Sequence, residues 1–176
     1  MKLDDINVML DIETLGVRSD AVIISIGAVV FTPTGLSEDT FYMPVGAQSC
    51  VDAGLKIDVS TVVWWMQRSR AARAVFAGQG EGVMPLDFVL KRFASWLPGD
   101  ACVWGNGAGF DNVILGNAYA AAVMSRPWPY TADRCFRTVK ALSSHVEADP
   151  FEGTPHHALD DAKHQARHLL KIAASW

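Results

Sequence analysis

A chain of 176 residues, half of them apolar and 19% charged, is long enough to bury a core and too apolar to be intrinsically disordered. Its formal net charge of −4 argues against nucleic-acid binding through bulk positive charge, but it leaves room for a local basic patch or a bound cation. The chain has three scattered cysteines without metal-type spacing, no signal-like N-terminus and no apolar run of bilayer length. These features predict a soluble, cytoplasmic protein without disulfides.

The first third of the chain predicts a meander of three antiparallel strands. The opening strand covers 7–16 and carries acidic residues at its end, a β-branched run over 21–31 makes the second strand, and 41–44 close a third. Turn residues at 32–35 keep the link short enough for antiparallel pairing. Residues 46–54 show no clear periodicity and are predicted to form a loop.

The rest of the chain alternates helices with one or two further strands. The apolar spacing predicts five helices, at about 61–76, 85–97, 110–124, 135–142 and 158–175. A short buried strand at 101–104 runs into the glycine-rich segment 105–109 and then into a helix, an order typical of α/β proteins. Two prolines within 127–130 leave room for at most a short edge strand. Residues 1–176 are therefore predicted to form a single α/β domain.

Two acids lie at the end of the opening strand. Asp11 and Glu13 are two residues apart, so their side chains point to the same face while Leu10 and Ile12 point into a core. Like charges this close repel each other, and a divalent cation that prefers hard oxygen ligands, Mg²⁺ or Mn²⁺, would offset the repulsion. The alternative is a solvated strand end that is acidic by chance.

Two later segments supply further acids. Asp111 lies in the first turn of the helix after the glycines, where it either joins the first pair or only complements the positive end of the helix. His156 precedes the last predicted helix and Asp161 lies in its first turn, near the edge of the apolar stripe, so both can face one cleft. A capped helix start with an exposed histidine is the alternative. Asp160 is better placed to face solvent or to cap the helix.

The separate sites point to one design. Asp11, Glu13, Asp111 and Asp161 could hold two divalent ions about 4 Å apart, an arrangement that hydrolyses phosphodiesters. One ion would activate a water, the other would stabilise the leaving oxygen, and His156 would act as the general base. No nucleophilic serine or cysteine motif competes with this interpretation.

Three stretches resemble the motifs of the DEDDh 3′-5′ exonucleases of the ribonuclease H-like superfamily. They are Asp11-Ile12-Glu13-Thr14-Leu15-Gly16, residues 104–112 and residues 156–162. Together with Trp64-Trp65, they look most like the small branch that includes phage exonuclease A, exodeoxyribonuclease VIII and a mycobacterial exoribonuclease. The resemblance implies an α/β, ribonuclease H-like fold with a central five-stranded mixed sheet flanked by helices.

The same resemblance implies the chemistry of the site. It assigns catalytic roles to Asp11, Glu13, Asp111, His156 and Asp161, and metal binding to the four acids among them. The family histidine precedes the last acid by five residues, which selects His156 over His157 and Asp161 over Asp160. The family pattern implies two Mg²⁺ or Mn²⁺ ions. It also implies a single-stranded DNA or RNA 3′ end as substrate and nucleoside 5′-monophosphates as products. Kinship with the branch also suggests a homodimer.

Substrate contacts are predicted at Thr14, Leu15, Trp65, Asn106 and Arg137. Leu15 resembles the family residue that wedges beside the terminal base, with a plain hydrophobic turn residue as the alternative. Backbone contacts from Thr14 and Leu15 fit either interpretation. Trp64 and Trp65 point about 100° apart on a helix, so one is expected in the core while the other is able to stack on a base.

Two basic clusters could bind phosphates of the incoming strand. They are Arg68, Arg70 and Arg73, and Arg134, Arg137 and Lys140. A solvated helix face is the favoured interpretation of the first cluster. His164 and His168 are expected on the surface, because no third ligand of matching type lies nearby in the sequence.

The leading hypothesis is a metal-dependent 3′-5′ exonuclease acting on single-stranded ends. A non-catalytic nucleic-acid-binding or polymerase-accessory module is the alternative, although such a module would be expected to lack an acid and none is missing. A phosphatase, or a nuclease acting on nucleotide-linked small molecules, would share the metal chemistry.

Overall fold

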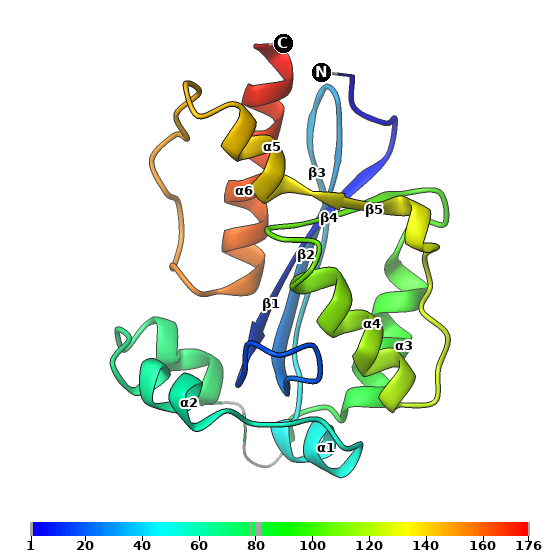
Figure 1. The fold of residues 1–176 in the computed structure, drawn as a ribbon, viewed down its shortest axis with the longest axis vertical. Coiled ribbons are helices and arrows are strands. Elements are labelled where there is room, and N and C mark those ends of the chain that lie inside the picture. The colour runs from blue at the N-terminus through cyan, green and yellow to red at the C-terminus, as the bar shows by residue number, and fades with distance from the viewer. Residues whose placement is uncertain (1, 78, 80–81, 176) are drawn as a thin grey trace.

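The computed structural model describes residues 2–77, 79 and 82–175, and its centre is a five-stranded mixed sheet with helices on both faces (Figure 1). The strands are β1 (Asn7–Thr14), β2 (Ile23–Thr32), β3 (Gly35–Pro44), β4 (Cys102–Gly105) and β5 (Asp133–Cys135). They lie in the order β3-β2-β1-β4-β5. β1, β2 and β3 pair antiparallel, whereas β4 and β5 run parallel to β1. The predicted α/β architecture with a central five-stranded mixed sheet is confirmed.

Two helical layers enclose the sheet. The helices are α1 (Ala47–Asp52), α2 (Val59–Met66), the 3₁₀ helix η1 (Ala72–Phe76), α3 (Leu86–Trp96), α4 (Asp111–Ala121), the 3₁₀ helix η2 (Tyr130–Ala132), α5 (Phe136–Leu142) and α6 (Ala158–Ala174). α3 and α4 pack on one face and α5 and α6 on the other, while α1 and α2 lie near the end of the sheet where β1 ends (Figure 1). In the part of the chain that is described, no helix is both long and apolar enough to cross a lipid bilayer.

The side chains of β1 alternate between the two faces of the sheet. Leu10 and Ile12 belong to the buried cluster that packs against α3 and α4, as predicted, whereas Met9 belongs to the cluster beneath α6. Asp11 and Glu13 follow Met9 at intervals of two residues. Their carboxylates therefore face the α6 layer, at the end of the strand.

The prediction of one helix over 61–76 is wrong, because two helices occupy this stretch. α2 ends at Met66, and η1 begins only at Ala72. Ser69 lies between them, and its Oγ accepts the backbone N–H of Ala72 at 3.1 Å. A serine that satisfies a helix start in this way favours a break over a helix interior, which apolar periodicity alone does not reveal.

The structure also differs from the prediction at one short helix. The predicted loop at 46–54 contains α1, a helix of six residues that is too short for apolar periodicity to show. The third strand ends at Pro44, as predicted, and it begins at Gly35, where its first half pairs with β2 while the side chains of 37–39 remain exposed. The short edge strand is present as β5, and it follows the prolines of 127–130.

A glycine in β2 allows α6 to begin directly on the sheet. Gly27 pairs with Asp11 of β1. A Cβ atom on Gly27 would lie 2.2 Å from the backbone nitrogen of Leu159 and 2.3 Å from the carbonyl carbon of Ala158. Backbone atoms cannot swing aside as a flexible side chain would, so α6 reaches this position only over a glycine.

Gly27→Ala is therefore expected to lower the free energy of unfolding by about 1–3 kcal/mol, the usual cost of overpacking a core. Urea unfolding followed by circular dichroism measures the change. Gly99→Ala is the matched control, because a Cβ atom on Gly99 would meet no atom within 4 Å. Equal stabilities of the two variants would contradict the close contact between β2 and α6.

Candidate active site

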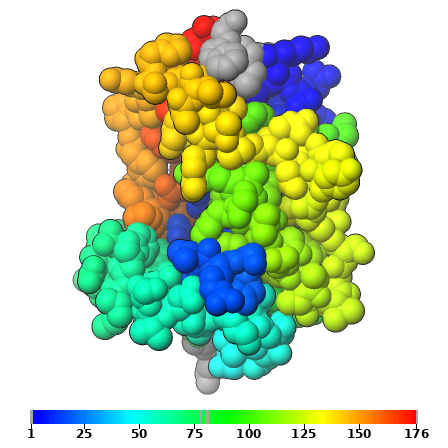
Figure 2. Space-filling view, in the orientation of Figure 1, coloured from blue at the N-terminus to red at the C-terminus, as the bar shows by residue number. Residues whose placement is uncertain are grey.

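Five side chains from separate segments line one cavity of about 240 Å³. They are Asp11 and Glu13 from the end of β1, Asp111 from the start of α4, and His156 and Asp161 from the start of α6. Figure 2 shows this hollow where the blue N-terminal strand is visible between the green segment after β4 and the orange segment that leads into α6. The structure thus brings together all four acids and the histidine that the sequence singles out.

Hydrogen bonds hold two of the carboxylates. Gln165 Nε2 donates to Asp11 Oδ1 at 2.8 Å, and the backbone N–H of His156 donates to Asp161 Oδ2 at 2.7 Å. One ligand-type atom from each of Glu13, His156 and Asp161 lies within 4.8 Å of the other two. Gln165 is absent from the sequence-based site, although it lies four residues after Asp161 and hence on the same helix face.

Close packing at a second glycine places Asp111. A Cβ atom on Gly105, the last residue of β4, would lie 3.0 Å from Asp111 Oδ2 and 2.4 Å from Asn112 Oδ1. The start of α4 therefore fits against β4 because Gly105 has no side chain. Asp111 is 3% exposed, so its carboxylate is almost fully removed from water.

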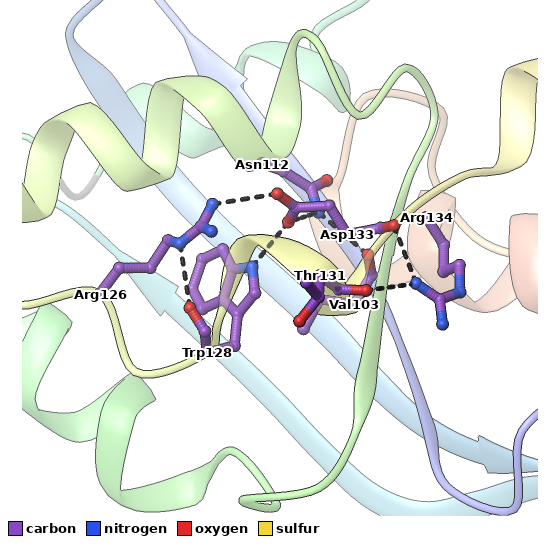
Figure 3. A network of polar contacts seen from close by, with 7 residues as sticks. All are labelled: Val103, Asn112, Arg126, Trp128, Thr131, Asp133 and Arg134. Carbon is purple, nitrogen blue, oxygen red and sulfur yellow. Dashed lines mark hydrogen bonds and ion pairs between the residues drawn. The ribbon is translucent and has the colours of Figure 1, made fainter.

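Asn112, the residue after Asp111, anchors the start of α4 through a polar network (Figure 3). Asn112 Nδ2 donates to the carbonyl oxygen of Val103 and to Asp133 Oδ1, both at 2.9 Å. Asp133 also accepts from Trp128 Nε1 at 2.7 Å and from the guanidinium of Arg126 at 3.1 Å. The network ties α4 to β4 and β5. Sequence reasoning missed it, because its members are joined only by the fold.

Burial raises the pKa values of all four carboxyls. The pKa of Asp11 lies well above its ordinary value, chiefly through burial and then through the charges of Asp111, Glu13 and Asp161. Burial raises the pKa of Glu13 to about 8, with Asp161 and Asp111 adding to the shift, and it raises the pKa of Asp111 to about 7. Burial also raises the pKa of Asp161, which the N–H of His156 partly counteracts. The protein groups around the cavity therefore do not fully offset the negative charge that the four carboxylates carry when they are ionised.

The donor set fits hard divalent cations. Asp111 Oδ2 is buried and has no hydrogen-bond partner among the described residues, so it keeps its full capacity to coordinate a cation. Carboxylate oxygens dominate the cavity, and none of the described residues that line it carries a thiol. This chemistry suits Mg²⁺ or Mn²⁺ better than a soft metal. Asp11, Glu13, Asp111 and Asp161 are the residues that would hold such ions.

An apolar cavity of about 370 Å³ adjoins the acids and includes Thr14 and Trp64 in its lining. The two adjacent tryptophans divide their roles. Trp65 is 3% exposed, and its Nε1 donates to the carbonyl oxygen of Thr14 at 2.9 Å, whereas Trp64 is 37% exposed. Leu15 is buried in the core cluster and does not line this cavity. The ring of Trp64 is therefore more accessible than that of Trp65 or the side chain of Leu15.

Arg137 is the member of the second basic cluster that faces the acids. It lines their cavity, as Asn106 does, and its guanidinium packs on Gly107, where a Cβ atom would lie 2.9 Å from Cζ. Arg134 turns away and donates to backbone carbonyl oxygens, and Lys140 lies over an aromatic ring of its own helix. Arg137 is therefore the residue that brings positive charge from this cluster to the cavity of the acids.

The prediction that His168 lies on the surface is wrong. Its side chain is buried, and its Nε2 lies 2.8 Å from the carbonyl oxygen of Val146. The ring of His164 packs on that of Phe151, with centroids 4.8 Å apart. Both histidines hold the loop that precedes α6 against the helix, a role that helical spacing could not disclose.

Comparison with known families identifies the family to which this set of four acids and a histidine belongs. Residues 6–173 match the model of a family described as the 3′-5′ exoribonuclease Rv2179c-like domain. The chain belongs to this family. It is a 3′-5′ exonuclease, as its three motifs predict. A comparison with curated protein sequences returns no match.

Solved structures of DEDDh nucleases share the fold. The nuclease domain of 3′hExo, a DEDDh family member bound to rAMP, is 16% identical with a TM-score of 0.65, over 97% of this chain and 92% of that chain. A 3′-exonuclease that recognises the 3′ end of the histone mRNA stem-loop is 15% identical with a TM-score of 0.67, over 97% and 82%. Escherichia coli exonuclease I with an oligonucleotide is 15% identical with a TM-score of 0.58, over 98% of this chain but 40% of that one. The predicted ribonuclease H-like fold is confirmed.

The raised carboxyl pKa values make a prediction about the metal-free protein. Glu13 and Asp111 hold protons up to about pH 8 and pH 7 in the folded state but release them near pH 4 when unfolded. The folded state then binds more protons than the unfolded state between these limits, so stability falls as pH rises from 5 to 8. Melting temperatures in EDTA are expected to fall over this range, and added Mn²⁺ is expected to stabilise more at pH 8 than at pH 5.

Glu13→Gln is the matched control, since it removes one of the repelling charges while keeping the side-chain volume. Its metal-free form is expected to lose less stability between pH 5 and pH 8 than the wild type does. A pH dependence identical to that of the wild type would show that the cluster is not the cause.

Proposed function

We propose that this exonuclease removes nucleoside 5′-monophosphates one at a time from the 3′ end of single-stranded nucleic acid, using two Mg²⁺ or Mn²⁺ ions. The convergence of Asp11, Glu13, Asp111 and Asp161 with His156 in one cavity carries the proposal. The exoribonuclease description of the family favours RNA over DNA as the substrate. We also propose that residues 1–176 act as one exonuclease domain, since the family match spans nearly all of them. None of the comparisons supports a homodimer, which is not part of the proposal.

The metal ions would be held by the four acids, and when bound they would supply Lewis-acid stabilisation of the charge that develops on the phosphate oxygens. His156 lies at the rim of this acid cluster and would take the proton from the attacking water. Asp161 fixes the backbone of His156 by accepting its N–H, so one acid of the cluster also places the base. Gln165 holds the carboxylate of Asp11 by donating an Nε2–H to its Oδ1.

The substrate would be held by groups on both sides of the acids. Arg137 faces the cavity with a guanidinium suited to a phosphate oxygen. Asn106 lines the same cavity, and its buried Oδ1 has no hydrogen-bond partner in the part of the chain that the structure describes. The adjoining apolar cavity, whose lining includes Thr14 and Trp64, would receive the terminal base. Trp65 also lines this cavity, but its ring is almost fully buried.

Release of mononucleotides from an end-labelled single strand in Mg²⁺ or Mn²⁺ tests the proposal. Asp11→Ala is expected to abolish release, and His156→Ala to lower kcat by about 10²–10⁴-fold, the usual contribution of a general base. His145→Ala, which removes an exposed histidine outside the cavity, is the control and should retain full activity. Binding of the strand without turnover by the wild type would instead support a non-catalytic module. Comparing the rates of release from RNA and DNA strands of the same sequence shows which of the two the enzyme prefers.

The division between the two tryptophans makes a separate prediction. Base stacking contributes about 1–3 kcal/mol per base, so Trp64→Ala is expected to raise KM by about 5–150-fold. Trp64→Phe, which keeps an aromatic face, should recover most of the loss. Trp65→Phe removes the hydrogen bond to Thr14 from a buried ring and is expected to lower the melting temperature rather than the affinity for substrate. The opposite pattern would assign stacking to Trp65.

A further inference from the structure

His156 has a backbone conformation that residues other than glycine seldom adopt. Its φ angle is +64°, in the left-handed region, where a residue with a Cβ atom is strained. Strained conformations of this kind persist only where the surrounding structure fixes them. The contacts that fix the segment 153–157 therefore decide where the imidazole of His156 lies.

Ion pairs farther along the loop do not provide this restraint. The loop from 143 to 155 is held to α6 by the pairs Lys171–Asp149 at 2.7 Å and Arg167–Glu152 at 3.0 Å. All four side chains are at least 42% exposed, and pairs of this kind contribute between about 0 and 1 kcal/mol each. They guide the loop along the helix without fixing its last residues.

Asp160 contacts the segment on both sides of His156. Its Oδ2 accepts the backbone N–H of Thr154 at 2.9 Å and lies 3.4 Å from Nδ1 of His157. A Cβ atom on Gly153 would lie 2.6 Å from the same carboxylate, so Asp160 fills the bend of the loop. Asp161, the next residue, instead accepts the N–H of His156 and faces the acid cluster. The two adjacent acids thus serve different partners.

Tyr42 connects the segment to the sheet. Its ring packs against the ring of His157, with centroids 4.2 Å apart and planes 32° apart. Tyr42 lies in β3 opposite Gly27, the residue over which α6 begins. The residue that follows His156 is therefore pinned between the sheet and the first turn of α6.

We propose that Asp160 is a positioning residue for His156 in addition to Asp161, which accepts the His156 N–H, and that it acts through Thr154 and His157 with Tyr42 as the support on the sheet. The inference rests on the proposed function, in which His156 is the general base. Asp160 does not line the cavity of the acids, so its effect on the reaction is indirect. Removing it would let the 153–157 segment relax and the imidazole move away from the attacking water.

Kinetics in two backgrounds test this role. Asp160→Ala is expected to lower kcat by about 10–100-fold with KM unchanged, because a displacement near 1 Å of a reacting group has an effect of this size. Asp160→Asn keeps an oxygen that accepts the N–H of Thr154 and should recover most of the loss. In a His156→Ala background, Asp160→Ala should cause no further loss, since the group that it positions is already absent.

Amide hydrogen exchange gives a readout that does not depend on catalysis. The Thr154 amide is expected to exchange faster in Asp160→Ala than in the wild type, and at the wild-type rate in Asp160→Asn. Asp149→Ala and Glu152→Ala, which break the exposed pairs of the same loop, are the controls and should leave kcat unchanged.

Two kinetic results would overturn the inference in an active enzyme: wild-type kcat in Asp160→Ala, or the same factor of loss in the His156→Ala background. An inactive wild type would refute the proposed function instead. In that event an unchanged Thr154 exchange rate in Asp160→Ala would still refute the role of Asp160 in holding the loop.

Discussion

The repulsion among four carboxylates in one poorly solvated cleft is the constraint to which the rest of the molecule is adapted. Removing a single charged carboxylate from water costs several kcal/mol in a folded protein, and each charged neighbour adds to the cost. The raised pKa values of Glu13 and Asp111 show that protein groups alone do not balance this charge. The compensating energy comes from burial elsewhere: the apolar side of β1 lies in one core cluster and Met9 in another. A cation that offsets the repulsion would therefore stabilise the fold and complete the site at once.

The scaffold brings the acids together by docking helix starts onto strand glycines. α6 begins over Gly27 and α4 packs on Gly105, and a Cβ atom at either position would collide with the helix. Both helices consequently direct their N-terminal ends toward the cavity, and the partial positive charge of a helix N-terminus favours nearby carboxylates. Asp111 and Asp161 lie in these first turns. The helix starts that bring the acids together thus also stabilise their charged forms.

Much of the fold could be predicted from the sequence, since it is encoded in local patterns. Alternation along β1 placed Asp11 and Glu13 on one face, whereas the choice of His156 over His157 came from the resemblance to the DEDDh family pattern. The missing parts depend on contacts between distant segments. Periodicity could not show which of Trp64 and Trp65 is buried, because the answer depends on the carbonyl group of Thr14 that accepts the indole N–H.

The same limit applies to the polar contacts around the site. Gln165 meets an acid from the far end of the chain, and Asp133 accepts hydrogen bonds from Asn112 of α4 as well as from Arg126 and Trp128 of the preceding loop. Sequence spacing identifies groups that share one helix or strand face. Pairs formed between elements follow from the register of the sheet and the docking of the helices, which spacing does not specify.

The acids and the base are held by different kinds of structure. Each acid lies on a strand or in the first turn of a helix, whereas His156 lies in a loop with a strained backbone. The ring of His156 packs edge-on against Trp64 at 5.0 Å and Trp65 at 6.1 Å, and both tryptophans line the apolar cavity. His156, the proposed general base, and the cavity proposed for the terminal nucleotide therefore share one aromatic cluster. A nucleotide stacked on Trp64 would therefore lie next to the aromatic cluster that the imidazole contacts. Hydrolysis would then depend on correct seating of the terminal base as well as on cation binding.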